Sequence, residues 1–82
     1  MSKFEKLIDY LRSKPTELSF EDVRRILENF GFMEVRVSGS HHIFKHKDGQ
    51  MVTIPTKSGR KVKRVYLQKI LNLIEFGNHD AD

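Results

Sequence analysis

The stretch FMEVRVSGSHHIFKHKDGQMVTIP, from Phe32 to Pro55, decides the fold of this chain. It contains short segments in which apolar and polar residues alternate or β-branched residues gather, and such segments are typical of strands. We therefore predict strands over 32–38, 42–46 and 51–55. Asp48-Gly49 lies between the last two segments, and an Asp-Gly pair favours the tight turn of a hairpin. Consecutive strands with short connections predict an antiparallel sheet.

Helices are predicted on both sides of these strands. Apolar residues recur at i, i+3, i+4 and i+7, the spacing of an amphipathic helix, over 3–12, 19–30 and 63–76. Ser19 can cap the second helix, and Gly31 supplies the left-handed residue that ends it. The expected fold is α+β, in the order α-α-β-β-β-α, with the helices packed on one face of a three-stranded antiparallel sheet. The other face is left free to meet a ligand.

The length of 82 residues predicts a single domain with one modest core. No cysteine is present, which excludes disulfide bonds, thiolate zinc sites and a cysteine nucleophile. The N-terminus lacks the apolar core of a signal peptide, and the apolar stretch Ile70–Ile74 is too short to cross a bilayer. We expect a soluble protein of the cytoplasm.

Positive charge is concentrated in the second half of the chain. Residues 36–74 contain nine lysines and arginines but a single acidic residue, Asp48, whereas residues 1–35 have a net charge of −1. A loop expected over 56–61 and the helix start after it hold five of the nine: Lys57, Arg60, Lys61, Lys63 and Arg64. A basic block in a folded domain attracts a polyanion, most often nucleic acid. The alternative is an ordinary solvated face.

The candidates for chemistry are the four histidines His41, His42, His46 and His79. Successive strand residues point to opposite faces, so His41 and His42 cannot chelate a metal together. No carboxylate or thiol near His42 and His46 completes a tetrahedral site, so no metal site is predicted. Histidine is instead suited to accept a proton at cellular pH, as RNA cleavage without a metal requires when a 2′-OH attacks the neighbouring phosphate. His79 falls in an expected tail and is interpreted as incidental.

The alternation within the middle strand leaves one question open. Ile43 shares a face with His41, and Phe44 shares the other face with His42. Either apolar residue can be the one that enters the core. The sequence therefore does not decide which face of the sheet carries His41.

Several sequence motifs resemble those of a known family. They are the run Gly39-Ser40-His41-His42-Ile43-Phe44-Lys45-His46, then Asp48-Gly49, Val52-Thr53-Ile54-Pro55 and Leu67-Gln68-Lys69-Ile70-Leu71. Together they resemble the HicA toxin family over Phe20 to Phe76. These are small bacterial mRNA interferases with a fold similar to the double-stranded-RNA-binding domain. The resemblance implies a HicA-like core over 19–77, with an additional helix and linker over 1–18 and a tail over 78–82.

The resemblance also implies an activity and a partner. The family's catalytic histidine directly follows Gly-Ser and falls on His41, with His42 as the alternative. We predict a metal-independent endoribonuclease without a cofactor, which cleaves mRNA with this histidine as general base. A HicB-like antitoxin is expected to neutralise it by covering the histidine surface. The residues predicted to contact RNA are Gly39, Ser40, Lys45, Lys57, Arg60, Lys61, Lys63 and Arg64.

The chain departs from many family members at two places. Lys57 stands where they have a histidine, and Val65-Tyr66 stands where they have Gly-Thr. A non-catalytic RNA-binding module, in which the histidines only contact phosphates or bases, is the second functional interpretation. A protein-interaction domain is the third, and it requires a large exposed apolar patch that the sequence alone does not place.

Overall fold

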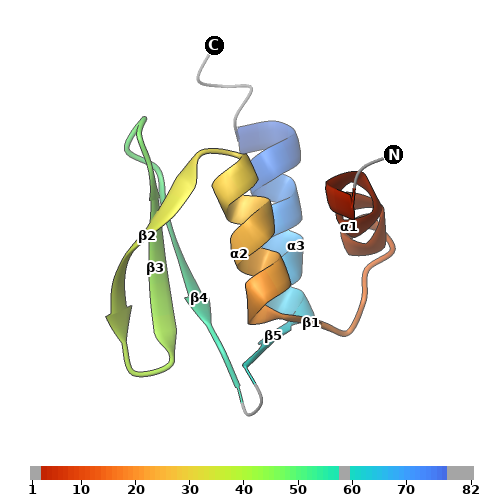
Figure 1. Ribbon diagram of the computed structural model, residues 1–82, viewed down its shortest axis with the longest axis horizontal. Helices are drawn as coiled ribbons and strands as arrows, with labels where there is room; N and C mark the ends of the chain where they lie inside the picture. The colour runs from red at the N-terminus through yellow and green to blue at the C-terminus, as the bar shows by residue number, and fades with distance from the viewer. Residues whose placement is uncertain (1–2, 58–59, 78–82) are drawn as a thin grey trace.

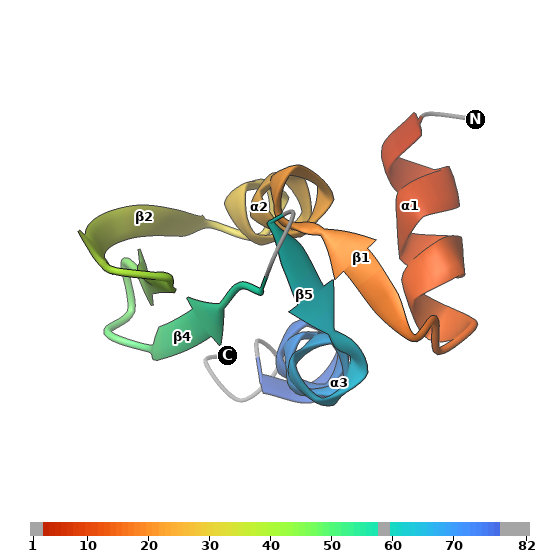
Figure 2. The same cartoon turned by 90° about the horizontal axis from the view of Figure 1, so that it is seen from below.

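The computed structural model describes residues 3–57 and 60–77 and shows three layers (Figure 1). The first layer is an antiparallel sheet in the order β2-β3-β4, formed by β2 (Phe32–Ser38), β3 (His41–His46) and β4 (Met51–Pro55). The second layer contains α2 (Phe20–Asn29) and α3 (Arg64–Asn72), which cover one face of this sheet. The third is α1 (Lys3–Arg12), on the far side of those two helices (Figure 2). The predicted α+β class and three-stranded antiparallel sheet are confirmed.

The boundaries of the first two helices follow from local chemistry. α1 has the bounds that its apolar spacing predicts. Ser19 accepts a hydrogen bond through Oγ from the amide of Asp22 at 3.3 Å, as expected of an N-cap. Gly31 has a φ of +92°, the left-handed conformation that ends α2.

The C-terminal helix differs from the prediction. A single helix over 63–76 was expected, but α3 ends at Asn72 and a π-helical turn, η1 (Leu73–Gly77), follows it. The tail expected over 78–82, which includes His79, lies outside the described residues. None of the helices formed by the described residues has the length and apolar character needed to cross a membrane.

A second, two-stranded sheet was not predicted from the sequence. β1 (Glu17–Ser19) pairs antiparallel with β5 (Lys61–Lys63), and Leu18 lies opposite Val62. Both side chains are buried, so this pairing connects the segment before α2 to the segment before α3 through the core. The predicted element order therefore lacks two strands, and the expected loop over 56–61 ends in β5.

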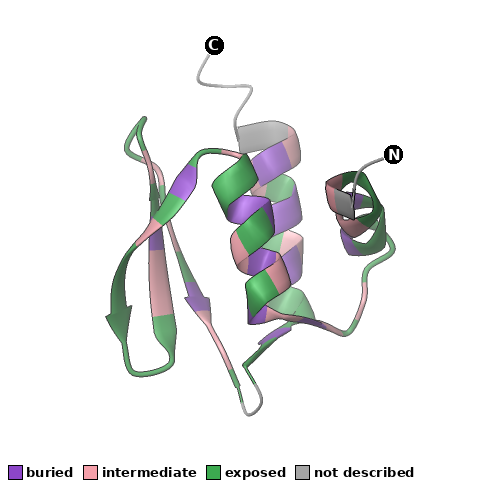
Figure 3. Cartoon of the chain, viewed as in Figure 1, coloured by how far each residue is buried: buried purple, intermediate pink, exposed green. Residues whose placement is uncertain are grey.

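The hydrophobic core lies between the sheet and the two central helices, and Figure 3 shows buried positions on the strands and on both of these helices. Phe20 of α2, Phe32 of β2 and Phe44 of β3 have no exposed surface. Leu11 of α1 is also completely buried, so the outer helix belongs to the same core.

Strand β3 presents its histidines on two faces. Phe44 is completely buried under the helices. His42 and His46 lie two residues before and two residues after it on the strand, so their side chains are on the same face as Phe44. His41 and Lys45 point to the opposite face, called here the outer face. The question left open by the sequence is thereby answered, because Phe44 is the core residue and His41 faces outward.

Candidate functional site

His41 opens β3 on the outer face, directly after the turn that connects it to β2. It is paired with Ser38 on one side and with Pro55 on the other. Gly39 in this turn has a φ of +60°, and a Cβ added there would meet no atom within 4 Å. The His41 side chain is exposed and makes no hydrogen bond, ion pair or ring contact with any described residue. Its imidazole is therefore available to a ligand that approaches over the turn.

His42 points into the molecule and is held by residues of β2 and α2. Its Nδ1 lies 2.6 Å from Oε2 of Glu34, and its ring lies over that of Phe20, with 4.0 Å between the centroids. Oε1 of Glu34 accepts a hydrogen bond from Nη2 of Arg24 at 2.9 Å. Only 12% of the His42 side chain is exposed. These contacts favour a structural role for His42. Because His41 is exposed and His42 is not, His41 is the histidine that a large ligand can reach.

Glu34→Gln is expected to destabilise the protein at neutral pH by about 1–3 kcal/mol, because the neutral amide lacks the negative charge that pairs with Arg24 in this partly buried place. Burial raises the pKa of the Glu34 carboxyl, but the hydrogen bonds from His42 and Arg24 outweigh it and hold the pKa below the ordinary 4.5. A lowered pKa stabilises the folded state above pH 4.5, and this stabilisation is lost as the pH falls through the lowered value. Urea unfolding at neutral pH and in acid should show the difference between the two proteins shrinking in acid.

Glu28→Gln provides the matched control, because Glu28 is exposed on α2 and forms no ion pair within the described residues. Its stability should equal that of the wild type at both pH values. If Glu34→Gln loses the same free energy of unfolding in acid as at neutral pH, the effect comes from packing and not from the charge.

His46 holds the turn between β3 and β4. Its Nδ1 accepts a hydrogen bond from the amide of Asp48 at 3.1 Å and lies 3.0 Å from Oδ1 of the same residue. Its ring packs edge-on against Phe32, with 5.0 Å between the centroids. A Cβ added to Gly31 would lie 2.7 Å from Nε2 of His46, so the imidazole also covers the end of α2. His46 is a packing residue.

Each of the two inward histidines contacts one carboxylate. Glu34 contacts His42 across the sheet, and Asp48 contacts His46 within the turn. These are separate pairs. Within residues 3–57 and 60–77, no three histidine, aspartate or glutamate side chains form a group that could hold a metal ion.

Two of the basic residues predicted to contact RNA are paired with carboxylates. Nζ of Lys57 lies 2.8 Å from Oε2 of Glu17, and Nη2 of Arg60 lies 3.0 Å from Oε2 of Glu21. Both acidic partners precede the basic block in the sequence. The fold brings them to it, so part of the positive charge that the sequence predicts for this surface is neutralised.

Of the remaining basic residues, one is held by backbone carbonyl groups and three form no salt bridge with a described residue. Arg64 donates through Nη2 and Nε to two backbone carbonyl oxygens, at 2.8 and 3.3 Å, in the segment before β1. Lys61 and Lys63 point to solvent from β5, and Lys45 is exposed on the outer face. None of these three lysines forms an ion pair within the described part of the chain. They carry the positive charge available to a polyanion.

The outer face also carries apolar side chains whose exposure the sequence did not reveal. Met33 and Met51 lie on either side of Lys45 in the strand register, and they are 68% and 59% exposed. Apolar residues exposed together on a sheet are typical of a protein-binding surface. We call Met33, Lys45 and Met51 the outer-face patch.

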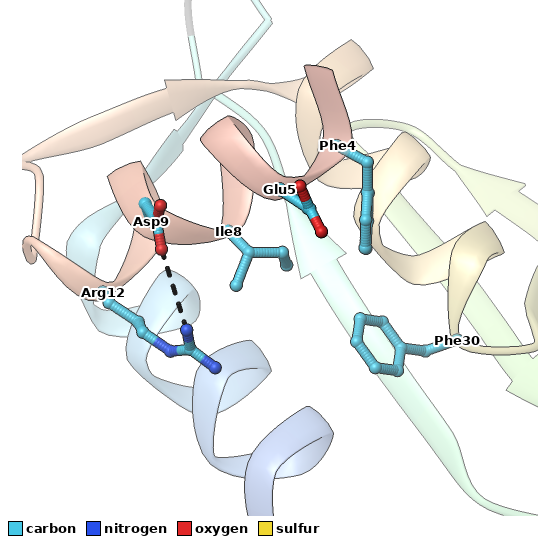
Figure 4. Close-up of a pocket in the computed structure, with 6 residues that line it drawn as sticks. All are labelled: Phe4, Glu5, Ile8, Asp9, Arg12 and Phe30. Atoms are coloured by element: carbon cyan, nitrogen blue, oxygen red, sulfur yellow. Dashed lines mark ion pairs between the residues drawn. The ribbon is translucent and has the colours of Figure 1, made fainter. Parts of the chain in front are cut away.

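One cavity lies away from His41, between α1 and the end of α2 (Figure 4). It encloses about 390 Å³ and is lined by Phe4, Glu5, Ile8, Asp9, Arg12 and Phe30. The rings of Phe4 and Phe30 lie 5.8 Å apart, and Arg12 pairs with Asp9 at 3.8 Å. No residue predicted to contact RNA lines this cavity, so it is not part of the candidate site.

Comparison with known proteins gives one match. Residues 20–76 match the family model described as HicA toxin of bacterial toxin-antitoxin. The matched segment begins at α2 and contains the whole three-stranded sheet and α3. No curated protein and no solved structure matches the chain.

Proposed function

Because the chain belongs to the HicA toxin family, we propose that it acts as the toxin of a toxin–antitoxin pair and cleaves mRNA as a metal-independent endoribonuclease. His41 is the general base. The observation that carries this proposal is the exposed imidazole of His41, which has no partner among the described residues and lies beside the open turn at Gly39. Its place of action is the cytoplasm, where mRNA is translated.

The fold supports the proposal. Two helices on one face of a three-stranded antiparallel sheet are the arrangement expected of a fold like the double-stranded-RNA-binding domain, which we propose for residues 20–76. Such domains recognise RNA mostly through shape, 2′-OH groups and phosphates. The free lysines Lys61 and Lys63 on β5 and the exposed Gly39-Ser40 turn offer contacts of this kind.

The proposed reaction needs one proton acceptor near a ribose. The imidazole of His41 takes the proton of a 2′-OH while that oxygen forms a bond to the adjacent phosphorus. The bond from phosphorus to the 5′ oxygen of the next nucleotide breaks, and this oxygen takes up a proton from solvent. The products are a 2′,3′-cyclic phosphate and a 5′-hydroxyl. Lys45 lies four residues further along the strand, about 13 Å away, so it is placed to contact a different phosphate.

The outer-face patch supports an antitoxin partner. Met33 and Met51 are exposed around Lys45 on the same face as His41. A HicB-like antitoxin that binds this face would bury these apolar side chains and cover the imidazole at the same time. Inhibition would then follow from exclusion of RNA.

Cleavage in the presence of EDTA tests the proposed activity. The purified chain should cut a single-stranded mRNA fragment under these conditions and leave a 2′,3′-cyclic phosphate. The same RNA with 2′-fluoro riboses should remain intact, because it lacks the attacking hydroxyl. RNA that is bound but never cut would instead support the non-catalytic RNA-binding module, and a chain that neither binds nor cuts RNA would refute both.

A further inference from the structure

A second pocket lies where the end of β4 meets β5 and the start of α3. It encloses about 280 Å³ and is lined by Pro55, Thr56, Lys57, Lys63, Val65 and Tyr66. Pockets for whole drug-sized ligands are about 300–1,000 Å³. A pocket just below this range suits a single flat ring system.

This pocket adjoins the candidate base. Pro55, which forms one wall, is paired with His41 across β3 and β4. Residues directly opposite each other in an antiparallel pair have side chains on the same face of the sheet. Thr56, the next wall residue, donates through its amide to the carbonyl oxygen of Ser40 at 2.9 Å. The edge of the pocket at Pro55 is therefore directly beside His41, on the neighbouring strand.

The pocket walls combine an aromatic ring with positive charge. Tyr66 is partly exposed, and its hydroxyl has no hydrogen-bond partner among residues 3–57 and 60–77. Outside the pocket wall, Nζ of Lys69 lies over the Tyr66 ring, 5.6 Å from its centre. Lys63 contributes a charge without an ion pair in the described structure. An aromatic side chain beside lysines is the combination with which proteins bind single-stranded nucleic acid, because bases stack on the ring and phosphates contact the charges.

We propose that this pocket binds one nucleobase of the single-stranded RNA substrate. The base stacks on Tyr66, and an adjoining phosphate contacts Lys63. The nucleotide held here neighbours the one whose 2′-OH faces His41, so the pocket fixes the register in which RNA crosses the active site. The inference rests on the proposed ribonuclease function and assigns Tyr66 as the residue that positions the substrate.

Tyrosine fluorescence tests the stacking directly. The chain has no tryptophan and two tyrosines, Tyr10 and Tyr66, so Tyr10→Phe leaves Tyr66 as the source of tyrosine emission. A single-stranded 2′-fluoro RNA oligonucleotide serves as a probe that cannot be cut. It should quench the emission of Tyr66 as it binds, whereas an abasic oligonucleotide of the same length should bind through its phosphates without the quenching.

Affinity measurements on variants separate stacking from charge. Tyr66→Leu should weaken binding of the probe by about 5- to 150-fold, the usual effect of removing one stacked base, with an unchanged dependence on salt. Lys63→Gln should lower the salt dependence by about one phosphate contact. Tyr66→Phe keeps the ring and should recover most of the affinity that Tyr66→Leu loses. Thermal unfolding of each variant shows whether it is folded.

Two results would overturn the inference, and they are distinct. If the probe binds without quenching Tyr66 and folded Tyr66→Leu binds it as well as the wild type, the pocket does not hold a base. The proposed function stands in that case. If no RNA binds under any salt condition, both the pocket assignment and the proposed function are wrong.

Discussion

Replacing His41 with alanine is expected to lower the rate of RNA cleavage by about 10²–10⁴-fold, the usual contribution of a positioned acid–base group. The fold should be unchanged, because the side chain is exposed and contacts no other described residue. Most RNA affinity should also remain, since lysines on other elements make the phosphate contacts. Single-turnover cleavage, thermal unfolding and a binding titration on the same samples separate the effect on chemistry from effects on folding and binding.

Three control variants sharpen this test. His41→Asn keeps a polar side chain but cannot take the proton, so its rate should fall as far as that of His41→Ala. Thr53→Ala removes another exposed side chain from the outer face and should leave the rate unchanged. His42→Ala breaks the contact with Glu34, so it should lower stability first, and its rate should follow the folded fraction.

One further observation bears on the role of His41. Cells should tolerate expression of His41→Ala but not of the wild-type chain. Undiminished cleavage by folded His41→Ala would show that this residue is not the base and would transfer the role to His42.

The elements predicted correctly from the sequence are those with strong local signals. Ser19 and Gly31 mark the ends of α2 through a hydrogen bond and a backbone angle that depend on near neighbours only. The pairing of β1 with β5 has no such signal, because each strand has three residues and shows no periodicity. It depends on burial of Leu18 against Val62, which lie far apart in the sequence.

The contacts of the histidines could not be predicted either, because they depend on which residues of neighbouring strands lie opposite each other. Glu34 lies two residues after the buried Phe32 and shares its inward face, opposite Phe44, and the register of β2 and β3 shifts only after Glu34. Alternation of polar and apolar residues does not say which face of a strand is buried, so the contact between Glu34 and His42 could not be foreseen. Val35 shows the same limit. Its place in an alternating segment correctly indicates a strand, but the pattern does not reveal that its side chain is 56% exposed.

Leu11→Ala is expected to cause the largest loss of stability among these variants, about 2–5 kcal/mol, because it removes a completely buried side chain and leaves a cavity. A small domain has a total stability of about 5–15 kcal/mol, so this is a substantial fraction. Each kcal/mol lowers the melting temperature of a domain of this size by roughly 4–8 °C. Thermal and urea unfolding measure the loss. The neighbouring residue gives the control, since Tyr10 is 50% exposed and Tyr10→Ala should change stability little.

The Leu11 result also decides whether α1 is part of the domain that carries the site, because α1 precedes the family match at residues 20–76. α1 is attached by Leu11 and Ile8 in the core and by Arg12, whose Nε lies 2.7 Å from Oε2 of Glu75 in η1. None of these residues lies near His41, so below the melting temperature Leu11→Ala should cleave RNA at the wild-type rate. Deletion of residues 1–15 should extend the effect, lowering stability further while leaving a weakly active remainder. A truncated chain as stable as the full one would mean that α1 is a detached arm and that its apolar stripe serves a partner instead of the core.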